Sequence, residues 1–151
     1  MPDNKKFNEI IDFAVAREKE AVEFYRKLQK IVKFAERIKL LKGLEKTEEE
    51  HIKILENIRK LGIVKTEVPN VQNLHISEYL VDAHFSEDMS YQDILITAMK
   101  REEASSKLYA DLASKSIDED EKQTFLRLAS EEEKHKLKFE LMYDQDILSQ
   151  D

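Results

Sequence analysis

Cysteine is absent from the 151-residue chain, and its absence excludes disulfides, thiolate metal sites and cysteine nucleophiles. Glycine and proline occur only twice each, so the chain has few of the turn residues that a sheet protein needs. No apolar run approaches the roughly 18 residues of a membrane-spanning helix. The net charge of −7 argues against nucleic acid or an anionic membrane surface as the main partner.

Charged residues, in contrast, are abundant, and apolar residues recur among them in the 3.6-residue rhythm of amphipathic helices. This pattern predicts an all-α protein. A chain of this length is sufficient for one domain with a sizeable core, so we expect residues 1–151 to form a single domain. No signal peptide is recognisable, and a cytoplasmic location is therefore expected.

The chain contains an internal repeat with an offset of 84 residues. The segment "AVAREKEAVEFYRKL" (14–28) corresponds to "AMKREEASSKLYADL" (98–112). Identical pairs at this offset include Ala14/Ala98, Arg17/Arg101, Glu18/Glu102, Tyr25/Tyr109, Leu28/Leu112, Leu44/Leu128, Glu48/Glu132, Glu49/Glu133, His51/His135 and Glu56/Glu140. A repeat of this kind in a helical chain predicts two copies of one supersecondary unit, here a helical hairpin.

The repeat selects one glutamate in each of two acidic runs. Each run precedes a histidine, as "EEEH" (48–51) and "EEEKH" (131–135). Glu131 lies on the same helical face as His135, but its counterpart in the first copy is Thr47. Glu48 and Glu132 both precede their histidine by three residues, so the shared signature is E-x-x-H. The neighbouring acidic side chains are expected to be solvated; they are Glu49, Glu50, Glu131 and Glu133.

Four helices are expected, over about residues 5–31, 35–61, 90–115 and 117–147. A slip in the phase of the apolar stripe places the first turn near residues 31–35. At the second turn, Ser116 as N-cap with Glu119 three residues later predicts a capping box at the start of the fourth helix. The connection 62–89 includes "HISEYLV", which suggests a short helix. This connection is long enough to run back along a helix of about 40 Å. The second and third helices would then be parallel, with the two hairpins related by a pseudo-twofold axis.

The glutamates and histidines of the signature fall on the apolar stripes. The expected stripe of the second helix is Phe34, Ile38, Leu41, Leu44, Glu48, His51, Leu55 and Ile58, and that of the fourth is Phe125, Leu128, Glu132, His135, Phe139 and Met142. Glu18 and Glu102 likewise occupy core-facing positions of the first and third helices, beside small residues. All six polar residues are at similar distances from their turns, so they are expected to meet near mid-bundle.

Four buried carboxylates without compensating charge would cost several kcal/mol each, which a domain stable by about 5–15 kcal/mol cannot sustain. Two divalent cations would neutralise them, and two imidazoles would complete the ligand sets; protonation of the carboxylates is the alternative. The predicted metal ligands are therefore Glu18, Glu48, His51, Glu102, Glu132 and His135. Tyr25 and Tyr109 also face the core, either as packing residues or as phenols that hydrogen-bond a ligand carboxylate. His75 and His84 lack E-x-x-H partners and are treated as non-ligands.

With these motifs, residues 7–143 resemble a rubrerythrin-type member of the ferritin-like superfamily. The resemblance implies a four-helix bundle with a di-iron carboxylate centre that reacts with hydrogen peroxide or dioxygen, with the same six residues as ligands. Two features depart from the family. The cysteine-ligated rubredoxin domain is missing, so electrons would come from an external electron-donor protein. A family glutamate three residues after the third-helix ligand is replaced by Ser105, which puts the usual peroxidase turnover in doubt.

Three functions remain open at this point. The first is a di-iron oxidoreductase that reduces peroxide or dioxygen. The second is a non-catalytic iron-binding or iron-handling protein with the same centre, and the third is a metal-free helical interaction protein with a vestigial site. Two iron ions are the expected cofactor, although manganese or zinc would also suit these ligands. The long connection would permit two chains to exchange hairpins and form a homodimer.

Overall fold

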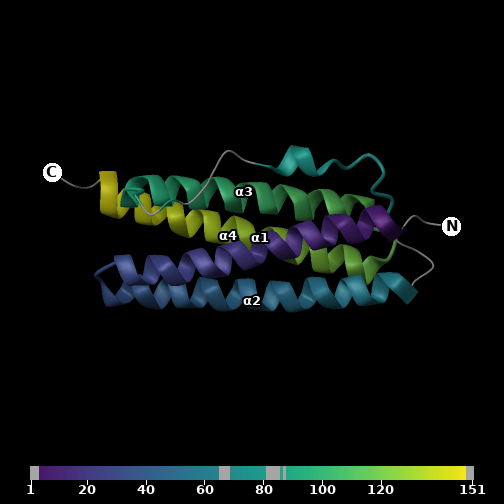
Figure 1. Ribbon diagram of the computed structural model, residues 1–151, viewed down its shortest axis with the longest axis horizontal. Coiled ribbons are helices and arrows are strands. Elements are labelled where there is room, and N and C mark those ends of the chain that lie inside the picture. The colour runs from purple at the N-terminus through teal and green to yellow at the C-terminus, as the bar shows by residue number, and fades with distance from the viewer. Residues whose placement is uncertain (1–3, 65–68, 81–85, 87, 149–151) are drawn as a thin grey trace. The chain divides into compact units, whose positions relative to one another are not determined.

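The computed structural model describes residues 4–64, 69–80, 86 and 88–148, and within these ranges it is helical and contains no strand. The elements are α1 (Asn4–Ile31), α2 (Ala35–Val64), the 3-10 helix η1 (Ile76–Tyr79), α3 (Tyr91–Lys115), α4 (Glu119–Tyr143) and the π-helical segment η2 (Asp144–Leu148) (Figure 1). The predicted all-α class with four long helices is confirmed. The short helix expected in the connection is present as η1.

The chain divides into two compact units, Met1–Val71 and Gln72–Asp151. In the first, α1 packs against α2, and in the second α3 packs against α4. Each unit is thus one of the two helical hairpins that the repeat predicts. The pseudo-twofold relation between the hairpins, the parallel course of α2 and α3, and the single-domain organisation stay predictions.

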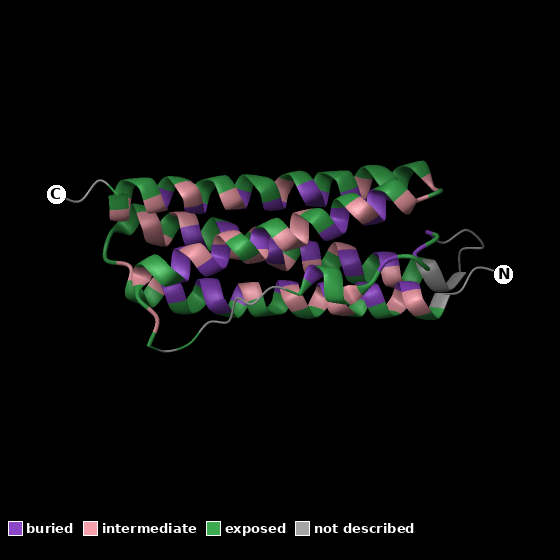
Figure 2. Ribbon diagram, turned by 90° about the horizontal axis from the view of Figure 1, so that it is seen from above, coloured by how far each residue is buried: buried purple, intermediate pink, exposed green. Residues whose placement is uncertain are grey.

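The first hairpin turns at residues 32–34, as the phase of the apolar stripe predicted. Its interior contains Leu41, Leu44, Leu55 and Ile58 of the predicted α2 stripe. The buried face of α1 is wider than a single line of residues, and its apolar residues are Phe7, Ile10, Ile11, Ala14, Val22, Phe24, Tyr25 and Leu28 (Figure 2). Phe34 was expected in the core and is 70% exposed. It lies in the turn before α2 begins, where the helical spacing that placed it on the stripe does not apply.

The second hairpin has capped helix ends that differ from the expectation. Asp118 is the N-cap of α4 and accepts a hydrogen bond from the Glu121 backbone N–H at 3.0 Å. The predicted capping box of Ser116 and Glu119 is therefore wrong. Ser116 is instead the C-cap of α3, where its hydroxyl donates to the Leu112 carbonyl at 2.8 Å. Two candidate caps lie within three residues here, and the short turn uses the later one for α4.

The remaining segments of the second unit are held on α3 by hydrogen bonds. The Tyr79 hydroxyl of η1 donates to Asp111 Oδ2 at 2.6 Å, and the Tyr91 hydroxyl donates to Asp146 Oδ2 of η2 at 2.6 Å. The regular α-helix of α4 ends at Tyr143, four residues before the predicted end, and the chain continues as the π-helical turn. Among the described residues, no helix combines the length and the apolar character that a bilayer crossing requires.

Candidate metal centre

The first hairpin brings together three of the predicted ligands, Glu18 of α1 and Glu48 and His51 of α2. His51 Nδ1 lies 3.5 Å from Glu18 Oε2 and 3.9 Å from Glu48 Oε2. One ligand atom from each of the three residues lies within 4.8 Å of the others. All three residues are at most 1% exposed. We call these three residues the α1–α2 set.

The second hairpin repeats this arrangement with Glu102 of α3 and Glu132 and His135 of α4, which we call the α3–α4 set. His135 Nδ1 lies 3.7 Å from Glu102 Oε2. The ligand atoms of these three residues again lie within 4.8 Å of one another, and each residue is at most 3% exposed. Each hairpin therefore contains a complete buried set of two carboxylates and one imidazole.

The helical repeat positions the side chains of each set. A spacing of three residues places Glu48 and His51 on one face of α2, where Leu44 and Leu55 are buried beyond them. In α4 the same spacing places Glu132 and His135 between buried Leu128 and Phe139. On the partner helices, Glu18 follows the small residue Ala14 by four positions and Glu102 follows Ala98 by four. Large apolar side chains thus close each set along the hairpin, and small ones leave room beside the carboxylates.

The donor chemistry of each set fits a divalent cation. Two ionised carboxylates carry a charge of −2 in a site that water does not reach, and burying such charges is costly unless they are compensated. One divalent ion would balance the charge of each set. Carboxylate oxygen with imidazole nitrogen is the ligation that iron, manganese and zinc accept in proteins. Each buried set of two glutamates and one histidine thus suggests a metal-binding site.

A network of charged side chains ties α1 to α2 one turn away from Glu48. Arg26 of α1 contacts Glu45 at 3.1 Å and Glu49 at 3.2 Å, and Gln29 donates to Glu45 at 2.8 Å. Burial by itself raises the pKa of Glu45, but the hydrogen bonds from Gln29 and Arg26 outweigh it, so the pKa lies below its usual value. The carboxylate of Glu45 therefore stays ionised and holds the hairpin closed beside the α1–α2 set.

The residues expected to lie outside the site do so where the structure describes them. Glu50 and Glu133 are exposed, Glu49 and Glu131 are partly exposed, and His75 of the connection is exposed. His84 lies outside the described residues. Tyr25 and Tyr109 are both buried, and their role as hydrogen-bond partners of the ligands stays a prediction.

Sequence reasoning missed one buried carboxylate, Glu121 in the first turn of α4, which is 7% exposed. The helical spacing could have identified it. Phe125 follows Glu121 by four residues and Leu128 follows Phe125 by three, so Glu121 continues the apolar stripe of α4. Glu121 lies eleven residues before Glu132, a rise of about 16 Å along the helix. It is therefore too far from the α3–α4 set to bind the same ion.

Paired helical hairpins with buried Glu/Glu/His sets define the class of four-helix carboxylate metalloproteins. The family model described as Rubrerythrin matches residues 9–143, and the chain belongs to this family. Among solved structures, a hypothetical protein from Pyrococcus furiosus shares the fold, with a TM-score of 0.69, 21% sequence identity and 95% coverage of both chains. The search of curated proteins found no match.

Proposed function

We propose that the α1–α2 and α3–α4 sets together hold two iron ions, in a protein that reduces hydrogen peroxide or dioxygen. Membership of the Rubrerythrin family supports this proposal. The observation that carries it is the presence of two equivalent buried sets, Glu18–Glu48–His51 and Glu102–Glu132–His135, each with donor atoms within 4.8 Å. Together they supply four carboxylates and two imidazoles, the ligand count of a dinuclear centre.

A bound pair of ferrous ions would supply two electrons to an O–O bond and recover them from a reductant. The residues of the chain provide the surroundings for this chemistry. The two histidines bind metal as neutral imidazoles, and the apolar residues beyond each set exclude bulk water. Reduction of one hydrogen peroxide to two waters consumes two electrons and two protons. The protons come from solvent, and in a chain without cysteine we assign the electrons to a separate donor protein.

A second function is favoured by one residue. Ser105 occupies the position one turn after Glu102 where the family pattern has an additional glutamate, and it is half-buried. A serine hydroxyl does not replace a carboxylate that exchanges position with the redox state of the metal. Non-catalytic iron binding or iron handling by the same centre is therefore the alternative. A metal-free interaction protein is disfavoured, since both donor sets are complete and buried.

Anaerobic reconstitution with Fe(II), followed by stopped-flow mixing with peroxide and separately with dioxygen, distinguishes these functions. An oxidoreductase binds two ions per chain and is oxidised rapidly, with repeated turnover when a reductant is present. An iron-handling protein binds the same two ions but is oxidised slowly. Elemental analysis that gives one ion per chain or fewer contradicts the dinuclear centre. Ser105→Glu is the matched variant, and faster peroxide turnover in it would assign the missing carboxylate as the limiting feature.

A further inference from the structure

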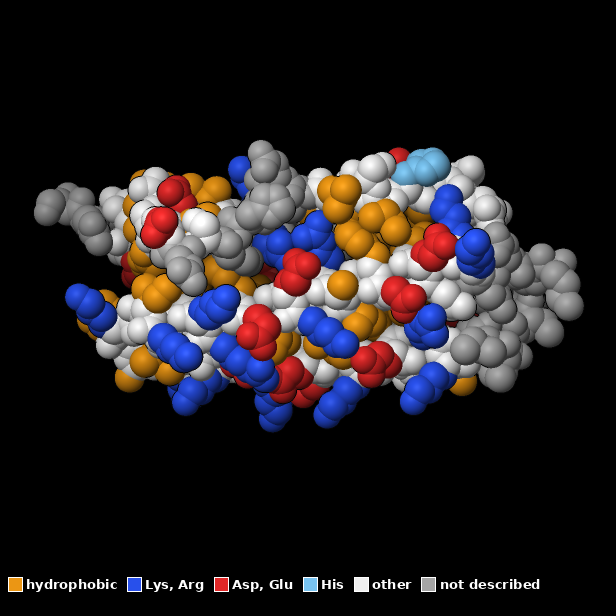
Figure 3. All heavy atoms as spheres, in the orientation of Figure 1, with side chains coloured by type: hydrophobic (Ala, Val, Ile, Leu, Met, Phe, Trp, Pro, Cys, Tyr) orange, Lys and Arg blue, Asp and Glu red, His pale blue; other side chains and the backbone are white. Residues whose placement is uncertain are grey.

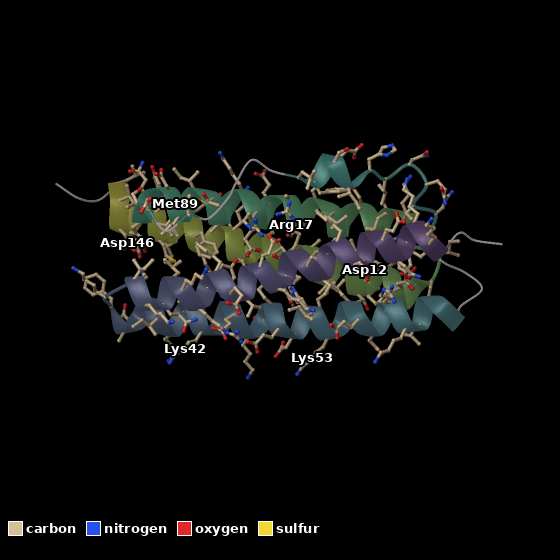
Figure 4. The ribbon with its side chains drawn as sticks, viewed as in Figure 1. Asp12, Arg17, Lys42, Lys53, Met89 and Asp146 are labelled. Carbon is tan, nitrogen blue, oxygen red and sulfur yellow. The ribbon has the colours of Figure 1, made fainter. Side chains whose placement is uncertain are left out.

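All five lysines of α2 lie on one face of the helix, and we call this face the lysine stripe: Lys39, Lys42, Lys46, Lys53 and Lys60. At 3.6 residues per turn they fall within an arc of about 60°, and no acidic residue falls inside that arc. All five are exposed. Lys42 and Lys53 are labelled in Figure 4, where both point away from the helices, and positive side chains project along the same edge in Figure 3.

None of the five lysines forms a salt bridge or side-chain hydrogen bond with any part of the chain that the structure describes, although the sequence has 32 acidic residues. The arginines of the same hairpin behave differently. Arg26 contacts Glu23, Glu45 and Glu49, and Arg59 pairs with Asp12 at 2.7 Å. The hairpin therefore neutralises its arginines internally, whereas the positive charge of the lysine stripe is available to another molecule.

The repeat shows that the fold does not require this stripe. The positions 84 residues after the five lysines are Gln123, Leu126, Ser130 and Leu137 of α4 and Asp144 of η2. They include no basic residue and carry two exposed leucines, Leu126 and Leu137. The two copies keep the same buried Glu/Glu/His set and differ on the outer face of the helix that carries the E-x-x-H motif. The basic face of α2 therefore has no counterpart at the equivalent positions of the second copy.

The stripe lies directly behind half of the candidate metal centre. Lys46 and Lys53 flank Glu48 and His51 along α2, but they point outward while Glu48 and His51 are buried against α1. A helix with its side chains is about 10–12 Å across. A molecule bound on the stripe is therefore separated from His51 by little more than one helix diameter. A shallow depression lined by Lys53, Ile54, Glu56, Asn57 and Lys60 lies on the same face and offers an apolar contact.

We propose that the lysine stripe is the docking surface for a small acidic electron-carrier protein, an inference that rests on the redox function proposed above. Five exposed lysines on one face of α2, with no acidic residue among them, would attract a negatively charged carrier to that face although the net charge of the protein is −7. Electron-transfer encounters use small, weak interfaces, for which one helix face is large enough. The carrier binds where the path to His51 is short.

The test compares Lys46→Glu/Lys53→Glu with the control Lys122→Glu/Lys138→Glu on α4. Both pairs change the net charge equally, and all four lysines are exposed. The probe is reduced rubredoxin, used as a small carrier with net negative charge, reacting with the iron-loaded protein at several ionic strengths. We expect the stripe variant to lose about tenfold or more in the second-order rate constant at low salt, with a flatter salt dependence. The control should lose much less, and reduction by dithionite should be unchanged in both.

A second readout does not depend on turnover. Titration of zinc-loaded protein with the oxidised carrier, followed by NMR, should shift resonances of the outer face of α2 in a salt-dependent manner. The docking surface would be overturned if the two variants lost equally in rate constant, or if the NMR shifts fell outside the outer face of α2. It would also be overturned if the wild type did not react with the carrier while dithionite supported turnover. Tighter binding of the stripe to anionic lipid vesicles than to the carrier would also overturn it. If the dithionite-reduced protein does not react with peroxide or dioxygen, the proposed function fails, and the NMR titration still decides the docking surface.

Discussion

His51 Nδ1 of α2 lies 3.5 Å from Glu18 Oε2 of α1, and the two residues are 33 positions apart in the sequence. Their repeat counterparts, His135 and Glu102, have the same separation in sequence, and the corresponding atoms lie 3.7 Å apart. A hairpin that turns midway between its two members brings them to the same level. The offset of 84 residues is therefore a structural equivalence between the hairpins as well as a similarity of sequence.

Glu132→Ala should weaken metal binding by about tenfold or more, whereas Glu131→Ala and Glu133→Ala should have little effect. Glu132 is 1% exposed in the α3–α4 set, while Glu133 is exposed and Glu131 lies 3.7 Å from Arg127 at the surface. Titration of each variant with Fe(II) or Mn(II) against a competing chelator measures the difference. Similar losses in all three variants would show that the repeat register does not identify the ligand.

Metal should be a major source of stability, and its contribution should increase from pH 5 to pH 8. Binding to the folded state alone stabilises by about 4 kcal/mol when the free metal exceeds Kd a thousandfold. Ligation requires neutral imidazoles at His51 and His135 and ionised carboxylates, so protons compete with metal as the pH falls. Thermal melts with and without Mn(II) across this range measure the shift in Tm. A shift that is absent, or that decreases as the pH rises, would contradict a metal site built from these residues.

The helices and the candidate ligands were predictable from the sequence because both depend on helical phase. The turn between α1 and α2 contains no glycine or proline and was located only by the change of stripe at residues 31–35; it is found at 32–34. The same periodicity placed Glu48, His51, Glu132 and His135 on the buried faces, and all four are buried. The 84-residue repeat strengthened each assignment, because the E-x-x-H motif falls on the apolar stripe in both copies.

Features that depend on local competition were not predictable in this way. Ser116 and Asp118 are both good N-caps, and only the geometry of the turn decides that Asp118 caps α4. Phe34 continued the spacing of the α2 stripe, but the helix begins after it, so its side chain is exposed. The π-helical end of α4 depends on long-range contacts such as that of Tyr91 with Asp146, which no periodicity reveals.

Tyr79→Phe should destabilise the second hairpin by about 1–2 kcal/mol, because it removes the 2.6 Å hydrogen bond from the buried hydroxyl to Asp111. Burial and the Asp111 carboxylate raise the pKa of Tyr79 above its ordinary value near 10. The folded state thus holds this proton more tightly than the unfolded chain does. The stabilisation is fully present below pH 10 and is lost as the pH rises above it.

Urea unfolding at pH 8 and pH 10.5 measures the free energies of unfolding of the wild type and of Tyr79→Phe. The difference between the two proteins is compared at the two pH values, because the titration of lysines is common to both and cancels. Tyr143→Phe is the control, since the Tyr143 hydroxyl accepts a hydrogen bond from Gln92 in an exposed position. The stability difference for Tyr79→Phe should narrow at the higher pH. A difference that widens would mean that the hydroxyl is not held as the neutral donor to Asp111.

Gly43→Ala should stabilise the protein by about 1 kcal/mol, because glycine is about 1 kcal/mol less favourable than alanine within a helix. Gly43 lies in the interior of α2 and is exposed, and a Cβ added there meets no atom within 4 Å. Its carbonyl accepts a hydrogen bond from the Thr47 hydroxyl at 3.1 Å, which the substitution leaves intact. Thermal melts of the metal-free protein should show a rise in Tm of about 2–4 °C. Lys39→Ala on the same helix is the control and should change Tm much less, because lysine is already a good helix former. A fall in Tm for Gly43→Ala would show that the outer face of α2 at this position is covered by another surface.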